Sequence, residues 1–281
     1  MVLGATAAGV RFDAEGYGPL AFFQTLFLIQ AWFPTDAELN WSGPSWSLSA
    51  EWFAYLLFPA YAWLALRLRA RPWVLLGIGA AAFVALDAFY VQAFGKVLPR
   101  AEDSLGILRI VPEFLVGMAL YGLGHRWRWS PPVAAAAALS TTVLLLGAMQ
   151  LSLDDRTIVA LAAPVILTWS LLARADCEGP LAAPGLVFAG EASFALYLVH
   201  MPVIVAWKGV VAELRGVDST FRITPVELIG LFIATALIAA ALHLLVEKPG
   251  RTWIRRRFDR RRDELAPAAL SPPALREPDD R

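Results

Sequence analysis

Residues 72–94 read PWVLLGIGAAAFVALDAFYVQAF, a run that contains a single charged side chain, Asp87. An α-helix needs about 20 consecutive apolar residues to cross the hydrocarbon core of a bilayer, so the run predicts a membrane-spanning helix. A carboxylate at membrane depth is costly unless it has a partner. Because the run offers Asp87 no partner, we expect a hydrogen bond from another helix.

Similar runs recur along the chain, which has 281 residues, of which 58% are hydrophobic and 17% charged. Soluble domains carry about 25% charged residues. The predicted fold class is therefore all-α: a multi-pass transmembrane helical bundle of about eight spans. The predicted spans are residues 18–33, 45–66, 72–94, 105–123, 132–151, 157–173, 190–211 and 226–246.

The chain is expected to divide into three parts. Residues 1–17 form an N-terminal segment, residues 18–256 a membrane domain, and residues 257–281 a disordered tail rich in basic and acidic residues. The single cysteine, Cys177, excludes a disulfide framework and a thiolate metal site. We find no nucleic-acid-binding signature, because the basic cluster near 251–262 directly follows an apolar run and is typical of a membrane surface.

Lysine and arginine set the expected orientation, because they concentrate in cytoplasmic loops. Alternating the spans with the C-terminal tail in the cytoplasm places seventeen basic residues inside and six outside, and Arg109 within a span. The short loop 67–71, with three arginines, supports the same orientation. Both termini are thus expected in the cytoplasm, with the protein in the inner or plasma membrane of a bacterial cell. The sequence does not indicate an oligomeric state.

Glu51 is an acid in an otherwise apolar and aromatic stretch, and helix capping does not explain it. A capping box would require Ser or Thr three residues earlier, at position 48, which is Leu48. Ser47 and Glu51 are instead separated by four residues and share a helix face. Glu51 is therefore a functional candidate near the outer end of its span.

Two further spans carry polar side chains at helical spacing. Arg109 and Glu113 form an i,i+4 pair, which either neutralises itself for insertion or turns one partner toward a polar cavity. Ser193, Tyr197 and His200 form a polar stripe, with His200 roughly 15 Å from the inner surface at 1.5 Å per residue. A histidine in that place favours a functional role. His243 and Glu247 are also i,i+4, and pairing at a helix end explains them.

Four blocks in this order resemble the acyltransferase-3 family of multi-pass membrane O-acyltransferases. They are WSLSAEWFAYLLFP at 46–59, RIVPEFLVGMALYG at 109–122, SFALYLVHMPV at 193–203 and VEKPGR at 246–251. The resemblance implies ten transmembrane helices with both termini cytoplasmic. It also implies transfer of an acyl group, commonly acetyl from acetyl-CoA, to a hydroxyl of a cell-surface or exported glycan or glycolipid.

The resemblance carries Glu51, Tyr197, His200 and Glu247 over as motif positions. The family also has an Arg followed by a His on its first helix, and that His is regarded as the base. Residues 1–17 contain no His. We interpret this difference as a misplaced start codon, with a fragment or a degenerate member as the alternatives.

Acyl transfer to an alcohol needs a proton acceptor and a donor for the developing oxyanion. The candidate catalytic residues are Glu51 and His200. The candidate lining of a substrate passage is Trp46, Ser47, Arg109, Glu113, Ser193 and Tyr197. Acyl-CoA is the expected co-substrate, with no bound cofactor and no metal. Its phosphates have candidate partners in Arg126, Arg128 and Lys248, although the concentration of basic residues in cytoplasmic loops explains these equally.

Two other functions fit buried Glu, Asp, Arg and His side chains. One is a transporter or permease of a polar solute, for which internal repeats would be expected; the sequence shows none. The other is an inactive family member that completes its site with another chain. The expected partners in the acyltransferase interpretation are the lipid bilayer, the glycan acceptor and acyl-CoA.

Overall fold

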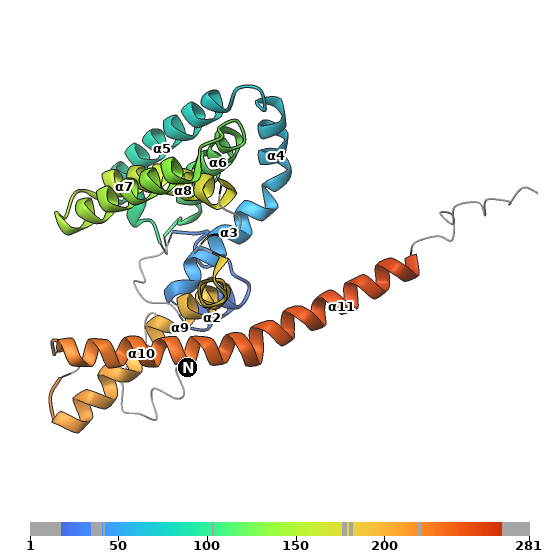
Figure 1. Cartoon of the computed structure of the whole chain (residues 1–281). Coiled ribbons are helices and arrows are strands. Elements are labelled where there is room, and N and C mark those ends of the chain that lie inside the picture. The colour runs from blue at the N-terminus through green and yellow to red at the C-terminus, as the bar shows by residue number, and fades with distance from the viewer. Residues whose placement is uncertain are drawn as a thin grey trace, which may run out of the picture. The chain divides into compact units, whose positions relative to one another are not determined.

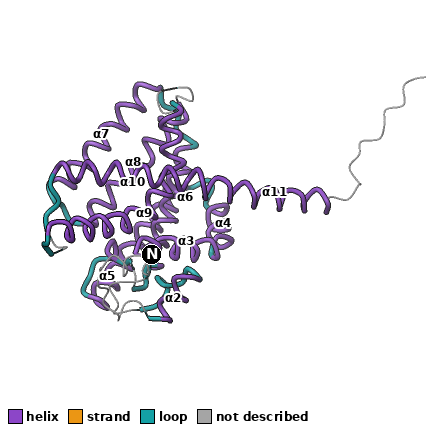
Figure 2. The backbone as a smooth tube through the Cα atoms, turned by 90° about the horizontal axis from the view of Figure 1, so that it is seen from below, coloured by secondary structure: helices purple, strands orange, loops and turns teal. Residues whose placement is uncertain are grey.

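The computed structural model describes residues 18–34, 41, 43–102, 104–175, 179, 182–218 and 221–265. Every regular element in these ranges is helical, and Figure 2 shows no strand among them. The chain forms two compact units. The first consists of Met1–Val187 with Lys208–Ser219, and the second of Phe188–Trp207 with Thr220–Arg281.

Of the described helices, seven lie wholly within the first unit. They are α2 (Pro19–Leu26), α3 (Trp46–Leu56), α4 (Phe58–Arg67), α5 (Pro72–Phe94), α6 (Ile107–Gly124), α7 (Pro131–Gln150) and α8 (Asp155–Ala175). Two short 3₁₀ turns, η2 (Gly43–Ser45) and η3 (Leu98–Arg100), precede α3 and α6. Helix α5 packs against α6 and α7 against α8, while α6 also contacts α3, α4 and α8, so α6 is central to this unit (Figure 1).

The second unit contains most of α9 (Pro184–Arg215) and one long helical stretch. That stretch runs from α10 (Pro225–Leu242) through a π-helical turn (His243–Glu247) into α11 (Lys248–Leu265). Thr224 begins it with a capping box, in which the Thr224 hydroxyl accepts from the Glu227 N–H and the Glu227 carboxylate accepts from the Thr224 N–H.

In the described part of the chain, six helices are long and apolar enough to cross a membrane: α5 to α9 and the stretch Pro225–Phe258. The predicted span 72–94 coincides with α5 residue for residue. The five predicted spans that follow it also fall on helices, with ends that differ by up to six residues. In α9 the predicted span starts later and ends earlier than the helix, and Pro202 lies inside both.

The first two predicted spans are not single long helices. Within 18–33, helix α2 ends at Leu26, and Leu28 adopts a left-handed backbone with φ of 55°. Within 45–66, the chain divides into α3 and α4 at Leu57. Pro59 accounts for the division, since proline has no N–H to donate and its ring clashes with the preceding turn.

The predicted start of the tail at residue 257 is placed too early. Helix α11 continues through that position to Leu265. Its first residues include the basic cluster that the sequence placed at a membrane surface. Residues 1–17 and 266–281 lie outside the described residues.

Close packing of α5 on α6 depends on Gly79. A Cβ atom at Gly79 would lie 2.9 Å from Val116 Cγ2 and 3.2 Å from the Val116 backbone nitrogen, whereas a Cβ at Gly77 would meet nothing within 4 Å. We expect Gly79→Ala to destabilise the folded protein by about 1–3 kcal/mol through overpacking. Gly77→Ala should be neutral or stabilising by up to about 1 kcal/mol, because alanine favours a helix.

Thermal unfolding of the two variants in the same detergent measures this difference. Equal melting temperatures for Gly79→Ala and Gly77→Ala would contradict the described packing of α5 on α6.

Candidate functional site

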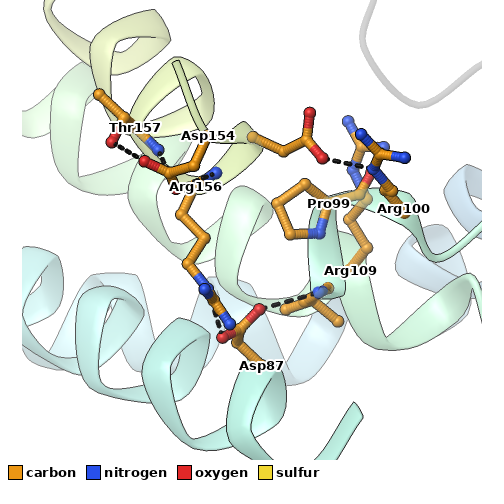
Figure 3. A network of polar contacts seen from close by, with 9 residues as sticks. Asp87, Pro99, Arg100, Arg109, Asp154, Arg156 and Thr157 are labelled. Atoms are coloured by element: carbon orange, nitrogen blue, oxygen red, sulfur yellow. Dashed lines mark hydrogen bonds and ion pairs between the residues drawn. The ribbon is translucent and has the colours of Figure 1, made fainter. Parts of the chain in front are cut away.

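Asp87 joins α5 to two other elements of the first unit. Its Oδ1 accepts a hydrogen bond from the Leu98 N–H at 2.8 Å, and its Oδ2 pairs with Arg156 Nε at 2.7 Å (Figure 3). Leu98 begins η3 and Arg156 lies in the first turn of α8. The carboxylate is 8% exposed and both of its oxygens are used. The expectation that another helix would satisfy Asp87 is thus confirmed.

A second pair joins the same two elements: Arg100 at the end of η3 pairs with Asp155 at the start of α8. Asp154, just before it, accepts from the Thr157 hydroxyl and from the backbone N–H groups of Thr157 and Arg156 (Figure 3). The Thr157 hydroxyl, and then its N–H, hold the pKa of Asp154 below its ordinary value. The loops before α6 and before α8 therefore lie at one end of the unit, as the predicted alternation of spans requires.

Arg109 lies at the same end and holds three groups in place. Its Nε donates to Glu113 Oε1 at 2.7 Å, and its Nη1 donates to the Pro99 carbonyl at 2.7 Å. Its guanidinium carbon is also 5.2 Å from the centre of the Trp46 ring, within the range of a cation–π contact. The predicted i,i+4 pair is confirmed. In addition, α6 meets the first residue of α3 through this one side chain.

The start of α3 is anchored by the segment after α2. Gln30 Nε2 donates to the Ser45 carbonyl at 2.9 Å and to the Ser45 hydroxyl at 2.8 Å, and the Ser49 hydroxyl accepts from the Ala31 N–H at 3.2 Å. Gln30 is 5% exposed. These bonds fix the residue directly before Trp46. Sequence reasoning missed Gln30, because nothing in its local sequence shows that it folds back onto residue 45.

Ser47 and Glu51 both lie on α3, but they do not bond to each other. The Ser47 hydroxyl instead donates to the Pro44 carbonyl at 3.4 Å, and Glu51 accepts a long bond of 3.4 Å from the Tyr55 hydroxyl. Glu51 is exposed on α3 rather than packed among the neighbouring aromatic residues. Its acid is therefore free of any capping or buried structural role in this unit.

Glu113 also borders a cavity. The volume is about 430 Å³ between α4 and α6, and Glu113 is the one charged residue in its lining. The other lining residues are Ala65, Ile110, Phe114, Gly117, Met118 and Tyr121. The Arg109–Glu113 pair therefore has one partner on a largely apolar cavity and the other on Trp46.

The polar stripe of α9 lies in the second unit. His200 Nδ1 is 2.6 Å from the Tyr197 carbonyl, and the two rings are 5.7 Å apart. A carbonyl only accepts, so Nδ1 is the donor in this contact and Nε2 is the ring nitrogen left for other partners. The Ser193 hydroxyl bonds to the Gly190 carbonyl at 2.7 Å. His200 is half-buried, so part of its ring is accessible.

His243 is more deeply placed than its position at a predicted helix end indicated. It is 0% exposed at the start of the π-helical turn, and its Nδ1 pairs with Glu247 at 3.0 Å. Its Nε2 is 3.7 Å from Glu191 without a hydrogen bond, and the Phe188 ring packs edge-on against it. The pairing with Glu247 is confirmed, but it occurs inside a continuous helix rather than at an exposed end. Its burial makes His243 less accessible to a substrate than His200.

The candidate CoA contacts are divided between the two units. Arg126 donates to the Arg69 carbonyl at 2.9 Å, and Arg174 donates to the Gly124 carbonyl at 2.7 Å. Arg128 borders a cavity of about 180 Å³ beside Arg174. Lys248 belongs to the second unit and is described apart from these arginines. Within the described ranges, no cluster of three or more His, Cys, Asp or Glu side chains could hold a metal ion.

Helices able to cross a membrane, with paired charges at their ends, define a multi-pass membrane protein. The acyltransferase domain family, Acyl_transf_3, matches residues 8–244. The chain therefore belongs to the acyltransferase-3 family, as the four sequence blocks predicted.

Two relatives are similar over most of the chain. The acyltransferase MdmB of Streptomyces mycarofaciens is 30% identical over 248 residues, which are 83% of this chain and 64% of MdmB. The exopolysaccharide production protein ExoZ of Rhizobium meliloti (strain 1021) is 26% identical over 235 residues, which are 80% of this chain and 67% of ExoZ. The chain thus spans somewhat less than two thirds of the length of MdmB. No solved structure matches the chain.

Proposed function

We propose that this chain is a membrane O-acyltransferase that moves an acyl group, most simply acetyl, from acyl-CoA to a hydroxyl of a cell-surface or exported glycan or glycolipid. Membership of the acyltransferase-3 family supports the reaction class. The name of ExoZ, a protein of exopolysaccharide production, supports a glycan as acceptor. Family membership also favours transfer over transport of a polar solute.

The observation that carries this proposal is the junction at Arg109. Two of the family-like blocks lie about 60 residues apart in the chain, and the junction brings Trp46 of one onto Arg109 of the other, which also pairs with Glu113. A guanidinium fixed by a carboxylate, a carbonyl and an indole is preorganised. Donors held in place before the reaction stabilise developing negative charge without reorganisation. The junction therefore suits an oxyanion formed during acyl transfer.

The proton of the acceptor hydroxyl is assigned to His200. Its Nδ1–H is held by the Tyr197 carbonyl, so its Nε2 can take the proton as the hydroxyl oxygen attacks the thioester carbon. The carbon–sulfur bond then breaks, and the proton passes to the departing CoA thiolate. The new oxygen–carbon bond is the ester.

A comparison of cells with and without the gene tests this function. Surface and exported glycans are isolated, and their O-linked acyl groups are measured by mass spectrometry before and after mild alkali. We expect deletion to remove an alkali-labile acyl group and re-expression to restore it. Glycans with unchanged ester content in the deletion strain would overturn the proposal.

The proposed orientation places both termini in the cytoplasm and the loop that contains η3 outside. In a Cys177→Ala background, we expect Lys96→Cys to react in intact cells with a thiol reagent that does not cross membranes. Arg69→Cys should be protected until the cells are opened. Both positions are exposed, at opposite ends of α5. Protection of Lys96→Cys together with labelling of Arg69→Cys would reverse the orientation.

Glu51 is proposed to position the acceptor hydroxyl or to orient a catalytic group, because its acid has no structural role in the first unit. Glu51→Gln should leave expression and membrane insertion unchanged and lower acyl transfer by about tenfold or more, the loss expected for a charge-assisted hydrogen bond. Glu213→Gln, at an exposed position on α9, is the matched control and should transfer normally. Normal transfer by Glu51→Gln would show that Glu51 neither positions the acceptor hydroxyl nor orients a catalytic group.

A further inference from the structure

A small cavity at the end of the first unit opposite to Asp87 combines aromatic and basic walls. Its volume is about 180 Å³, and its lining consists of Trp127, Arg128, Trp129, Leu171, Arg174 and Ala175. The first three residues come from the connection between α6 and α7, and the last three from the final turns of α8. None of these described lining residues is acidic.

The aromatic wall of the cavity consists of two indoles, Trp127 and Trp129, and the ring of Trp129 has fewer ring contacts than that of Trp127. Trp127 contacts two indoles: the ring of Trp129 is parallel to it at 5.9 Å, and the ring of Trp73 is tilted against it at 6.0 Å. Trp129 contacts Trp127 alone among the ring pairs of the described chain. Its ring is half-buried. Trp129 therefore offers a surface on which a flat ligand ring can stack.

The basic wall holds one fixed and one available guanidinium. Arg174 is held through its Nη1 by the Gly124 carbonyl at 2.7 Å. Arg128 is exposed and makes no hydrogen bond or ion pair with any described residue. Guanidinium groups match the geometry of phosphate oxygens and bind them with two parallel hydrogen bonds. The cavity thus has two donors for a phosphate beside a platform for a ring.

Surface effects alone would not give this arrangement. Basic residues gather on the cytoplasmic side, and tryptophans gather at membrane interfaces. Both tendencies place basic and aromatic side chains near the cytoplasmic surface of the membrane. Neither requires residues from two separate segments to line the same cavity. Arg67 is a comparable arginine elsewhere: it lies over the Trp63 ring at 5.0 Å and is not part of this lining.

We propose that this cavity binds the nucleotide end of acyl-CoA, with the adenine ring on Trp129 and phosphate groups at Arg128 and Arg174. The proposal rests on the proposed function, since it names where that reaction takes its donor. Sites for a whole drug-sized ligand measure about 300–1,000 Å³. A cavity of about 180 Å³ therefore holds one end of CoA and leaves the pantetheine arm and thioester outside it.

Equilibrium binding of radiolabelled CoA to the purified protein tests the site. Arg128→Gln should raise the dissociation constant about tenfold or more, because it removes a charge-assisted contact to phosphate. Trp129→Leu should raise it about fivefold to a hundredfold, the range for loss of base stacking on an aromatic ring. Trp129→Phe keeps an aromatic face and should bind nearly as the unaltered protein. Arg67→Gln, the matched arginine beside a tryptophan, should bind CoA normally.

Competition and kinetics complete the test. Adenosine 3′,5′-bisphosphate should displace CoA, whereas inorganic phosphate and vesicles of anionic lipid should not at equal concentration. In the transfer assay, Arg128→Gln should raise KM for acyl-CoA and leave kcat unchanged, as expected for lost ground-state binding.

Three outcomes would overturn the site. Normal CoA affinity in both Arg128→Gln and Trp129→Leu would place the donor elsewhere while the proposed function stands. Displacement by inorganic phosphate without displacement by the nucleotide would show a simple anion site. Failure of the unaltered protein to bind CoA would remove this site and the CoA donor of the proposed function together.

Discussion

His200→Asn should lower the rate of acyl transfer by roughly 10²–10⁴-fold, the contribution typical of a general base. The Nδ1 of His200 is fixed by the Tyr197 carbonyl at 2.6 Å, so the other ring nitrogen is the one that can accept a proton. Asparagine can keep the hydrogen bond to that carbonyl but cannot take up a proton at neutral pH. The measurement is the initial rate of ester formation at saturating acyl-CoA, with the amount of membrane-inserted protein equalised.

His125 provides a matched control for this variant. Its Nδ1 also lies near a backbone carbonyl, that of Tyr121 at 3.1 Å, and its ring packs on the Tyr121 ring at 4.1 Å. His125 is exposed beyond the end of α6, outside the polar stripe of α9. His125→Asn should therefore transfer acyl groups at the normal rate. Equal loss in the two variants would point to a shared structural effect, and no loss in His200→Asn would remove His200 as the proton acceptor.

Arg109→Gln should reduce transfer by about 100-fold, the loss found when one preorganised donor to an oxyanion is removed. The substitution also frees Glu113 and removes the cation–π contact with Trp46. Arg109→Lys should be nearly as damaging, because an ammonium group lacks the planar fork that reaches Glu113 and the Pro99 carbonyl together. The measurement is kcat/KM for both substrates.

Arg100→Gln is the control for Arg109. Arg100 lies on η3, next to the carbonyl that Arg109 binds, and its pair with Asp155 is exposed. Exposed ion pairs contribute little to stability, so this variant should fold and transfer normally. Full activity in Arg109→Lys would contradict the role given to the fork geometry, because a single positive charge would then suffice.

The sequence predicted the parts of this structure that depend on a single helix. Residues 72–94 are long, apolar and free of internal proline, and they form α5 with the predicted ends. The Arg109–Glu113 and His243–Glu247 pairs follow from helical spacing alone, and both are present. The need of Asp87 for a hydrogen-bond partner from another helix likewise follows from the sequence, because residues 72–94 contain no other charged side chain.

The remaining features depend on contacts between segments that are distant in the chain. Arg156 as the partner of Asp87, and Gln30 as the anchor of Ser45, required the folded arrangement. The left-handed turn at Leu28 also has no signal, since leucine rarely adopts that conformation. The division of 45–66 into two helices at Leu57 does have a cause in the sequence, namely Pro59. The continuous apolar character of 45–66 nevertheless led to the prediction of a single span.

These differences changed the interpretation of the candidate site. Ser47 and Glu51 share a helix face, yet Ser47 turns to the backbone of Pro44 and Glu51 stays exposed. Trp46, by contrast, gained a specific partner in Arg109. The first unit thus contributes the contact between α3 and α6 at Arg109, and the second unit, described by itself, contributes the Tyr197–His200 turn of α9.

The most direct measurement uses the purified protein in liposomes with acyl-CoA labelled in the acyl group and a glycan acceptor. Ester formation is followed as alkali-labile label on the glycan, and CoA release is followed as free thiol. The account predicts that ester and free CoA appear in equal amounts, that both depend on the acceptor, and that both are lost together in Arg109→Gln and His200→Asn. Free CoA without ester, or ester formation unaffected by both substitutions, would contradict it.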